Sequence, residues 1–290
     1  MQWPLASRPI RPAEIPFYNL HYLYAGRSPS DPTMVWGTDV DAEALEDHVK
    51  RANDGSSTVI SIAHVLLQAV GRAISRHPQL NRRVVGHRIF AFREINIRMM
   101  TYDKRQGEVD VVLIKNADRI ELERIAQVMW KNQWKSLRGT SLDHLDKQTL
   151  RRWPNPFLCW AVKAYFWLDR NFRLPKTGKI DRISSAPVLV NYLGFPGAPA
   201  MRAYKPSNHP DESSHLSVTM GRIELRPVVR DREIVVRPTA PLFVRADHRI
   251  ADAYLLAQFV NTLTGFLAAP ATMESGEASQ DPKETSAQAA

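Results

Sequence analysis

One histidine and one aspartate lie close together where a strand pattern gives way to a helix pattern. The segment Leu242–Ala246 has the composition of a strand, His248 follows it, and helical spacing resumes after Asp252. A histidine held between two rigid elements has a pKa near neutrality, which suits it to take a proton from a thiol, hydroxyl or amine. The pattern also has a structural explanation, because aspartate is a favoured helix N-cap and His248 can simply occupy the turn. Spacing alone leaves both interpretations open.

The motifs of several other chemistries are absent from the sequence. It contains no GxGxxG, GxxxxGK[ST], HExxH or GxSxG pattern. The single cysteine, Cys159, lies in an apolar stretch without a local base, so we expect it to be a packing residue. One cysteine excludes an intramolecular disulfide and a CxxC-type zinc site, which fits a reducing compartment. We therefore predict no metal site.

The charge balance favours anionic partners. The formal net charge is +9, with 44% hydrophobic and 24% charged residues. Such a balance suits nucleic acid, anionic lipid or a phosphate-bearing molecule such as coenzyme A. The basic residues are spread along the chain and match no nucleic-acid-binding signature, so we expect no nucleic acid partner. Met1–Phe17 has no apolar leader and no apolar run is long enough to span a bilayer, so we expect a cytoplasmic protein.

Helix and strand patterns alternate along the chain, which predicts a layered α/β (α+β) sandwich. Helical spacing predicts helices over Ser61–Arg76, from Asp118 to about Trp134, and from Asp252 to before Pro270. Strand-like composition covers Met34–Asp39, Arg83–Phe90, Ile95–Tyr102, Glu108–Ile114, Val188–Tyr192, His215–Met220, Glu233–Arg237 and Leu242–Ala246.

We expect three parts: an N-terminal arm over 1–33, one domain over 34–268 and a disordered tail over 269–290. Within the domain, an insertion at about 150–179 is rich in aromatic residues and has basic ends, including Arg151 and Arg173. Such a segment can cover the core of its own domain, contact another subunit or lie at a membrane surface. The sequence leaves these alternatives open.

A longer pattern surrounds the histidine. Residues 220–260, MGRIELRPVVRDREIVVRPTAPLFVRADHRIADAYLLAQFV, and the upstream segments LLQAVGRAISRHPQLN (66–81) and VDVVLIKNADRIELERIA (109–126) follow one another in a characteristic order. In that order and spacing they resemble the catalytic domain of the acyltransferase subunits of 2-oxo acid dehydrogenase complexes. The VTMGR run (218–222) is also similar to chloramphenicol acetyltransferases. The resemblance covers roughly residues 34–268 and implies the chloramphenicol acetyltransferase-like fold, a mixed sheet with helices packed on it.

The resemblance assigns roles around the family's DHRxxDG motif. Asp247, His248, Arg249 and Asp252 match it, and Ala253 stands where the family has glycine. His248 is then the general base. Asp247 and Arg249 give structural support, and Asp252 holds the loop through an ion pair with an N-terminal arginine, for which Arg8 and Arg11 are the candidates.

The resemblance also places an oxyanion donor. In the family a serine or threonine hydroxyl before an x-x-Gly turn donates to the tetrahedral intermediate, and Asn191 stands at that position. An asparagine amide can also donate a hydrogen bond. Its longer side chain shifts the donor, which is a departure from the family pattern.

The implied function is transfer of an acyl group from a thioester, acyl-CoA as co-substrate, to an unidentified thiol, hydroxyl or amine, with no permanently bound cofactor. The resemblance further implies a homotrimer with active sites between subunits and a small-molecule or carrier-bound acceptor. The alternative is a non-catalytic binding or assembly protein of the same fold, with possible membrane-surface contact through 150–179. The asparagine at the oxyanion position is only weak evidence for that alternative.

Overall fold

The structure is a computed structural model. It describes residues 7–11, 14, 33–85, 88–103, 108–137, 186–195 and 215–273, with scattered positions between 154 and 168 and between 197 and 202.

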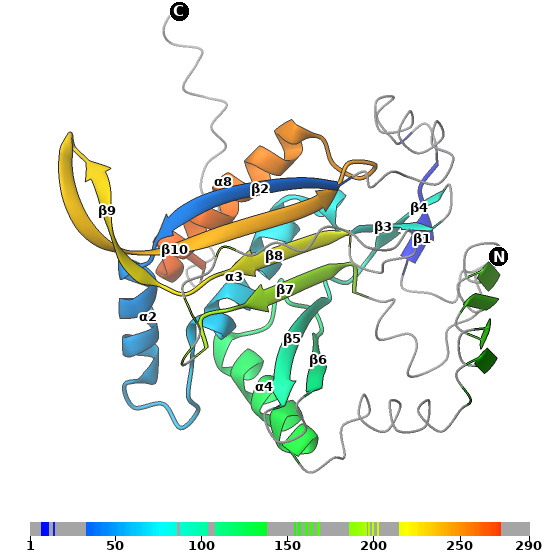
Figure 1. The fold of residues 1–290 in the computed structure, drawn as a ribbon, viewed down its shortest axis with the longest axis horizontal. Coiled ribbons are helices and arrows are strands. Elements are labelled where there is room, and N and C mark those ends of the chain that lie inside the picture. The colour runs from blue at the N-terminus through cyan, green and yellow to red at the C-terminus, as the bar shows by residue number, and fades with distance from the viewer. Residues whose placement is uncertain are drawn as a thin grey trace, which may run out of the picture.

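A seven-stranded mixed sheet forms the centre of the molecule (Figure 1). Its order is β2-β10-β8-β7-β5-β6, and β9 pairs with the free part of β10. The pairs β5·β7 and β7·β8 are parallel, and the other pairs are antiparallel. The strands are β2 (Thr33–Asp41), β5 (Ile97–Asp103), β6 (Glu108–Ile114), β7 (Val188–Tyr192), β8 (Leu216–Met220), β9 (Glu224–Arg230) and β10 (Glu233–Asp247).

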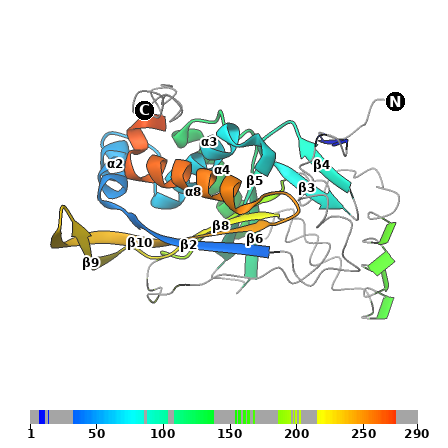
Figure 2. The same cartoon turned by 90° about the horizontal axis from the view of Figure 1, so that it is seen from above.

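Four helices pack on one face of this sheet (Figure 2). They are α2 (Glu43–Asn53), α3 (Ile62–Arg76), α4 (Leu122–Leu137) and α8 (Ala253–Ala268), and α3 lies at the centre with eleven of its residues buried. The alternation along β10 turns Leu242, Val244 and Ala246 into the core beneath them. Phe243 and Arg245 therefore lie on the opposite sheet face.

A second, smaller sheet lies beside the end of β10 (Figure 1). It has the order β1-β4-β3, from β1 (Ser7–Pro9), β3 (Arg82–Val85) and β4 (Arg88–Phe92), and the 3-10 helix η2 (Pro78–Leu80) leads into it from α3. Its apolar side chains Ile10, Val84 and Ile89 form a separate buried cluster with Ile250. This sheet therefore contacts the segment that follows β10.

The hairpin of β9 and the first half of β10 projects from the body (Figures 1 and 2). Cross-strand pairing gathers apolar side chains on one face, where Ile234 lies opposite Val229 and Val236 opposite Pro227. On the apolar face Leu225, Val229, Ile234 and Val236 are all exposed. On the other face, Arg237 pairs with Asp41 and Glu43 of the body.

The predicted helices and most of the predicted strands are present, with two differences. Arg83–Phe90 is not one strand but the hairpin of β3 and β4, and the two predicted strands near the C-terminus form the single strand β10. The carbonyls of Pro238 and Pro241 accept hydrogen bonds from Ala42 N and Gly221 N, so the strand continues through both prolines.

The predicted boundary between the domain (34–268) and the tail (269–290) lies too early in the sequence. The 3-10 helix η3 (Pro270–Met273) follows α8 and buries Pro270 and Met273, so ordered packing continues to Met273. Residues 274–290 and most of the 150–179 insertion lie outside the described residues. In the described part of that insertion, Phe157, Trp160 and Trp167 are exposed. Among the helices that the structure describes, none has the length and apolar character needed to cross a bilayer.

Candidate active site

His248 lies in a tight turn between the end of β10 and the start of α8. The main-chain carbonyl of Asp247 accepts hydrogen bonds from Ile250 N (2.9 Å) and Ala251 N (3.1 Å), which closes the turn around His248. The imidazole is half-buried, and its Nδ1 lies 2.9 Å from the carbonyl oxygen of Ala251. A carbonyl can only accept, so Nδ1 carries the proton and Nε2 carries the lone pair of the neutral ring.

The Asp247 carboxylate holds this turn from the inside. Its Oδ1 accepts from Arg249 N and Nε, both at 2.9 Å, and its Oδ2 accepts from Arg249 Nη2 at 2.6 Å. His215 Nδ1 donates to Oδ2 at 2.9 Å. The side chains of Asp247 and His215 are almost completely buried, and that of Arg249 is mostly buried.

The network keeps fixed charge states. Burial would raise the pKa of the Asp247 carboxyl, but the hydrogen bonds from His215 and Arg249 outweigh burial and hold that pKa far below its usual range. Burial lowers the pKa of His215, against the hydrogen bond to Asp247 that raises it, and the positive charges of Arg83 and Arg249 lower it further. Around neutrality Asp247 is therefore ionised and His215 neutral.

A second anchor lies on the other side of His248. Ile250 is 5% exposed and packs with Ile10, Val84 and Ile89 of the small sheet. The turn is thus fixed by a polar network through Asp247 and by apolar packing through Ile250. The predicted supporting roles of Asp247 and Arg249 agree with this geometry.

Asp252 caps helix α8. Its Oδ1 accepts a hydrogen bond from Leu255 N at 2.8 Å, in extended backbone geometry, which confirms the N-cap interpretation. Of the two arginines considered as its ion-pair partner, Arg11 pairs with Glu14 at 2.9 Å, and the Arg8 side chain lies outside the described residues. The described contacts of Asp252 are those of a structural residue.

Asn191 lies on the sheet face away from the helices. Its Nδ2 donates to Thr219 Oγ1 at 3.3 Å, across the parallel pair β7·β8. Thr219 lies opposite Phe243 on β10, and Phe243 precedes Asp247 by four residues, a separation of about 13 Å along a strand. Within one chain the structure therefore does not bring Asn191 and His248 together.

Two residues of this region were missed by sequence reasoning. Nothing in the spacing singles out His215, whose link to Asp247 depends on the pairing of β8 with β10. Thr219 was included only in the VTMGR run, although its hydroxyl accepts from Asn191 and can donate onward.

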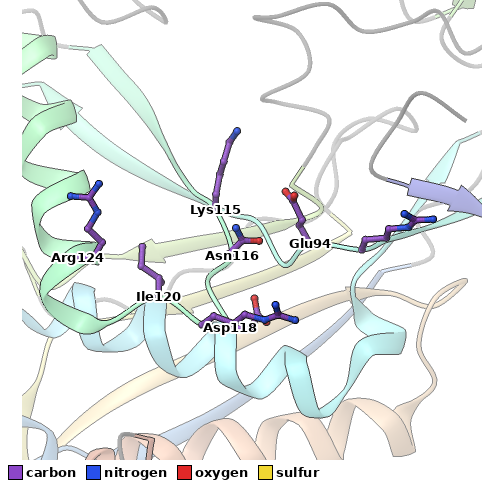
Figure 3. Close-up of a pocket in the computed structure, with 8 residues that line it drawn as sticks. Glu94, Lys115, Asn116, Asp118, Ile120 and Arg124 are labelled. Carbon is purple, nitrogen blue, oxygen red and sulfur yellow. The ribbon is translucent and has the colours of Figure 1, made fainter.

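A hollow of about 640 Å³ lies farther along the sheet, where β6 leads into α4 (Figure 3). Four cationic and two acidic side chains line it, and one pair of these, Arg119 and Asp118, is joined at 3.1 Å. In Figure 3 the charged ends of Lys115 and Arg124 remain apart. The lining side chains carry a net positive charge, but the ends of Lys115 and Arg124 do not point toward a common position. Across the described residues no group of three or more potential metal ligands was found.

Comparisons with known proteins agree with this architecture. The family model for 2-oxoacid dehydrogenases acyltransferase (catalytic domain) matches residues 28–147 and 214–274. A probable dihydrolipoamide acetyltransferase from Listeria monocytogenes is similar at 19% identity and TM-score 0.62, covering 94% of this chain and 97% of that one. The Azotobacter vinelandii dihydrolipoamide acetyltransferase shows 16% identity and TM-score 0.62 over 88% of each chain. No curated protein matches the sequence.

A third solved structure is a truncated catalytic core of the 2-oxoacid dehydrogenase multienzyme complex from Thermoplasma acidophilum. It is 14% identical with TM-score 0.58, covering 87% of this chain and 94% of that one. At these identities the likeness is one of fold. It confirms the predicted mixed sheet with helices packed on it, in the chloramphenicol acetyltransferase-like fold.

Proposed function

Because the chain belongs to the family of 2-oxoacid dehydrogenases acyltransferase catalytic domains, we propose that it transfers an acyl group from a coenzyme A thioester to a thiol, with His248 as general base. The observation that carries this proposal is the bond from His248 Nδ1 to Ala251 O. That bond fixes the tautomer in which Nε2 can accept a proton. The proteins of known structure that resemble the chain include dihydrolipoamide acetyltransferases.

The reaction follows from this tautomer. His248 Nε2 takes the proton of the acceptor thiol, and the thiolate attacks the thioester carbonyl to give a tetrahedral intermediate. When the carbonyl re-forms, the bond to the coenzyme A sulfur breaks and the imidazolium returns the proton to that sulfur. A base of this kind contributes about a hundredfold to ten-thousandfold to the rate.

The test uses acetyl-CoA as donor and dihydrolipoamide as the probe thiol, and the S-acetyldihydrolipoamide that forms is separated from acetyl-CoA by chromatography and quantified. We expect His248→Ala to lose about a thousandfold in kcat while its unfolding midpoint stays unchanged. His77→Gln is the matched control, because His77 contacts Thr262 away from the turn and should keep full activity. Equal turnover by His248→Ala and the wild type would refute the role of the base.

The oxyanion needs a donor, and Asn191 and Thr219 supply two candidates on one patch of the sheet. Since this patch lies about 13 Å along the strand from Asp247, we propose that the patch of one copy faces His248 of another. The homotrimer implied by the sequence resemblance provides such a pairing. The exposed apolar face of the β9–β10 hairpin supports the assembly, because such surfaces usually mark contacts.

Light scattering tests the assembly. We expect the wild type to be trimeric, and Ile234→Lys on the apolar face of the hairpin to give inactive monomers. Glu233→Lys is the control, since Glu233 lies on the opposite face and should leave the trimer intact. A fully active monomer would contradict both the trimer and the shared site.

A non-catalytic binding protein is the second candidate, because Asn191 stands where the family has a serine or threonine hydroxyl. Calorimetric titration with coenzyme A and several acyl-CoAs separates the two, since a binding protein of another kind would bind none. The exposed Phe157, Trp160 and Trp167 favour a membrane surface as its partner. Failure to sediment with anionic liposomes at low salt would remove that partner.

A further inference from the structure

His215 holds Asp247 at two points. Its carbonyl oxygen accepts a hydrogen bond from Asp247 N at 2.9 Å, and its Nδ1 donates to Asp247 Oδ2 at 2.9 Å. The side chain of His215 is 5% exposed, at the start of β8. The backbone contact would form with any residue, but the side-chain contact needs a donor at this position.

A continuous chain of contacts runs from His215 to His248. Asp247 Oδ1 accepts from Arg249 N, and Asp247 O accepts from Ile250 N and Ala251 N, so both ends of Asp247 shape the turn. The carbonyl of Ala251 then accepts from His248 Nδ1. A rotation of the Asp247 carboxylate would change the turn, and with it the carbonyl that fixes the His248 tautomer.

We propose that His215 is a positioning residue, which acts through Asp247 to hold the turn and the tautomer of His248. The proposal rests on the proposed function for its effect on activity. His215 does not act on the substrate, because its ring is buried and already engaged with Asp247.

Simple core packing does not explain this histidine. Its Nε2 is buried without a hydrogen-bond partner among the atoms that the structure describes, which is unfavourable for a polar atom. The groups whose charges act on the ring are Asp247, Arg249 and, from the small sheet, Arg83. A leucine would fill the space without an unpaired nitrogen, so the retained feature is the Nδ1 donor directed at Asp247.

Two kinds of variant distinguish a role of the His215 hydrogen-bond donor from a role of its side-chain bulk in packing. In His215→Asn the amide nitrogen stands near the position of Nδ1 and keeps the donor, whereas His215→Leu and His215→Phe keep apolar bulk and remove it. We expect His215→Asn to keep kcat within about threefold for acetyl transfer from acetyl-CoA to dihydrolipoamide. We expect the leucine and phenylalanine variants to lose about tenfold or more in kcat with little change in KM.

The second readout does not need activity. Long-range proton–nitrogen NMR of the imidazoles, with His248 assigned from His248→Gln, reports which nitrogen of His248 carries the proton. We expect the Nδ1–H tautomer in the wild type and in His215→Asn, and a mixture in the variants without a donor. If the wild type transfers no acetyl group but the tautomer still shifts, the proposed function fails and the positioning role remains.

Three outcomes would overturn the proposal. One is a donor-free variant with wild-type kcat and an unchanged His248 tautomer. Another is His215→Asn and His215→Leu losing activity equally while both stay folded. The third is that His215→Leu and His215→Phe do not fold, while His215→Asn folds but has a shifted His248 tautomer. That result would mean that His215 is needed for folding alone.

Discussion

Strand β10 ends in two different ways. At its C-terminal end, Asp247 is buried and hydrogen-bonded to His215, and Ile250 in the turn that follows packs against the small sheet. At its N-terminal end, the hairpin with β9 projects from the body, with Ile234 77% exposed. The same strand therefore has one end that is packed on several sides and one end that is exposed.

The difference follows from what each end pairs with. Residues 239–247 of β10 have β2 on one side, and residues 242–246 also have β8 on the other, whereas residues 233–238 pair with β9 alone. A strand paired on both sides and covered by helices on one face buries the side chains that point to that face. A two-stranded ribbon is only marginally stable by itself, so the hairpin depends on the ion pairs of Arg237 with Asp41 and Glu43, or on a partner. One end holds a site in place, and the other offers a contact surface.

The largest predicted effect comes from the same substitution at the two ends. Asp247→Asn removes a buried charge that His215 and Arg249 both contact, and we expect it to cost about 3 kcal/mol of unfolding free energy. Asp231→Asn lies in the exposed hairpin turn, where φ is 50° and asparagine is well tolerated, so its effect should stay within about 0.5 kcal/mol. Urea unfolding measures both. Similar losses in the two variants would mean that the two ends are equally constrained.

An isoleucine pair sharpens the comparison. We expect Ile250→Ala to cost about 2–4 kcal/mol, because Ile250 is 5% exposed in the small-sheet cluster. Ile234→Ala should change the stability of a single chain by about 0.5 kcal/mol or less. Urea midpoints at several protein concentrations separate folding from assembly, since only an assembly contact gives a concentration-dependent midpoint. A concentration-dependent loss confined to Ile250→Ala would reverse the assignment of the two ends.

The periodicity of the sequence was enough to predict the central helices and most strands, but it did not predict which strands pair with one another. Helix α2 was missed because its apolar residues are few, and Leu45 is its only buried one. Two separate strands were predicted where β10 is continuous, because the carbonyls of Pro238 and Pro241 are paired through contacts with distant segments. Which strands become neighbours depends on contacts between distant segments, and local patterns do not encode those contacts.

The same limit applies to the site. The DHRxxD pattern placed Asp247, His248 and Arg249 in one turn because they are sequence neighbours. His215 stands 32 residues before Asp247 and meets it only through the pairing of β8 with β10. The expected meeting of Asn191 with His248 is not found within one chain, because the strand register separates them.

A smaller effect is expected at Asp252, just beyond the turn. Asp252→Ala removes the hydrogen bond to Leu255 N and should cost about 1 kcal/mol, whereas Asp252→Asn keeps a good N-cap and should lose only a few tenths, about 0.3 kcal/mol. Thermal unfolding measures the difference, and acetyl transfer is measured in parallel. If Asp252→Asn were stable but inactive, the carboxylate would have a role beyond capping.

The smallest expected effect is on the pH dependence of stability at the turn. Burial lowers the pKa of His215 below its ordinary 6.5, so on acidification the unfolded chain binds a proton that the folded chain does not. The unfolding free energy should therefore fall as the pH drops below 6.5. His215→Asn removes this group and should make that decline shallower between about pH 7.5 and about pH 5. Urea unfolding at both pH values gives the slopes, and a steeper decline in His215→Asn would show that His215 is protonated in the folded protein.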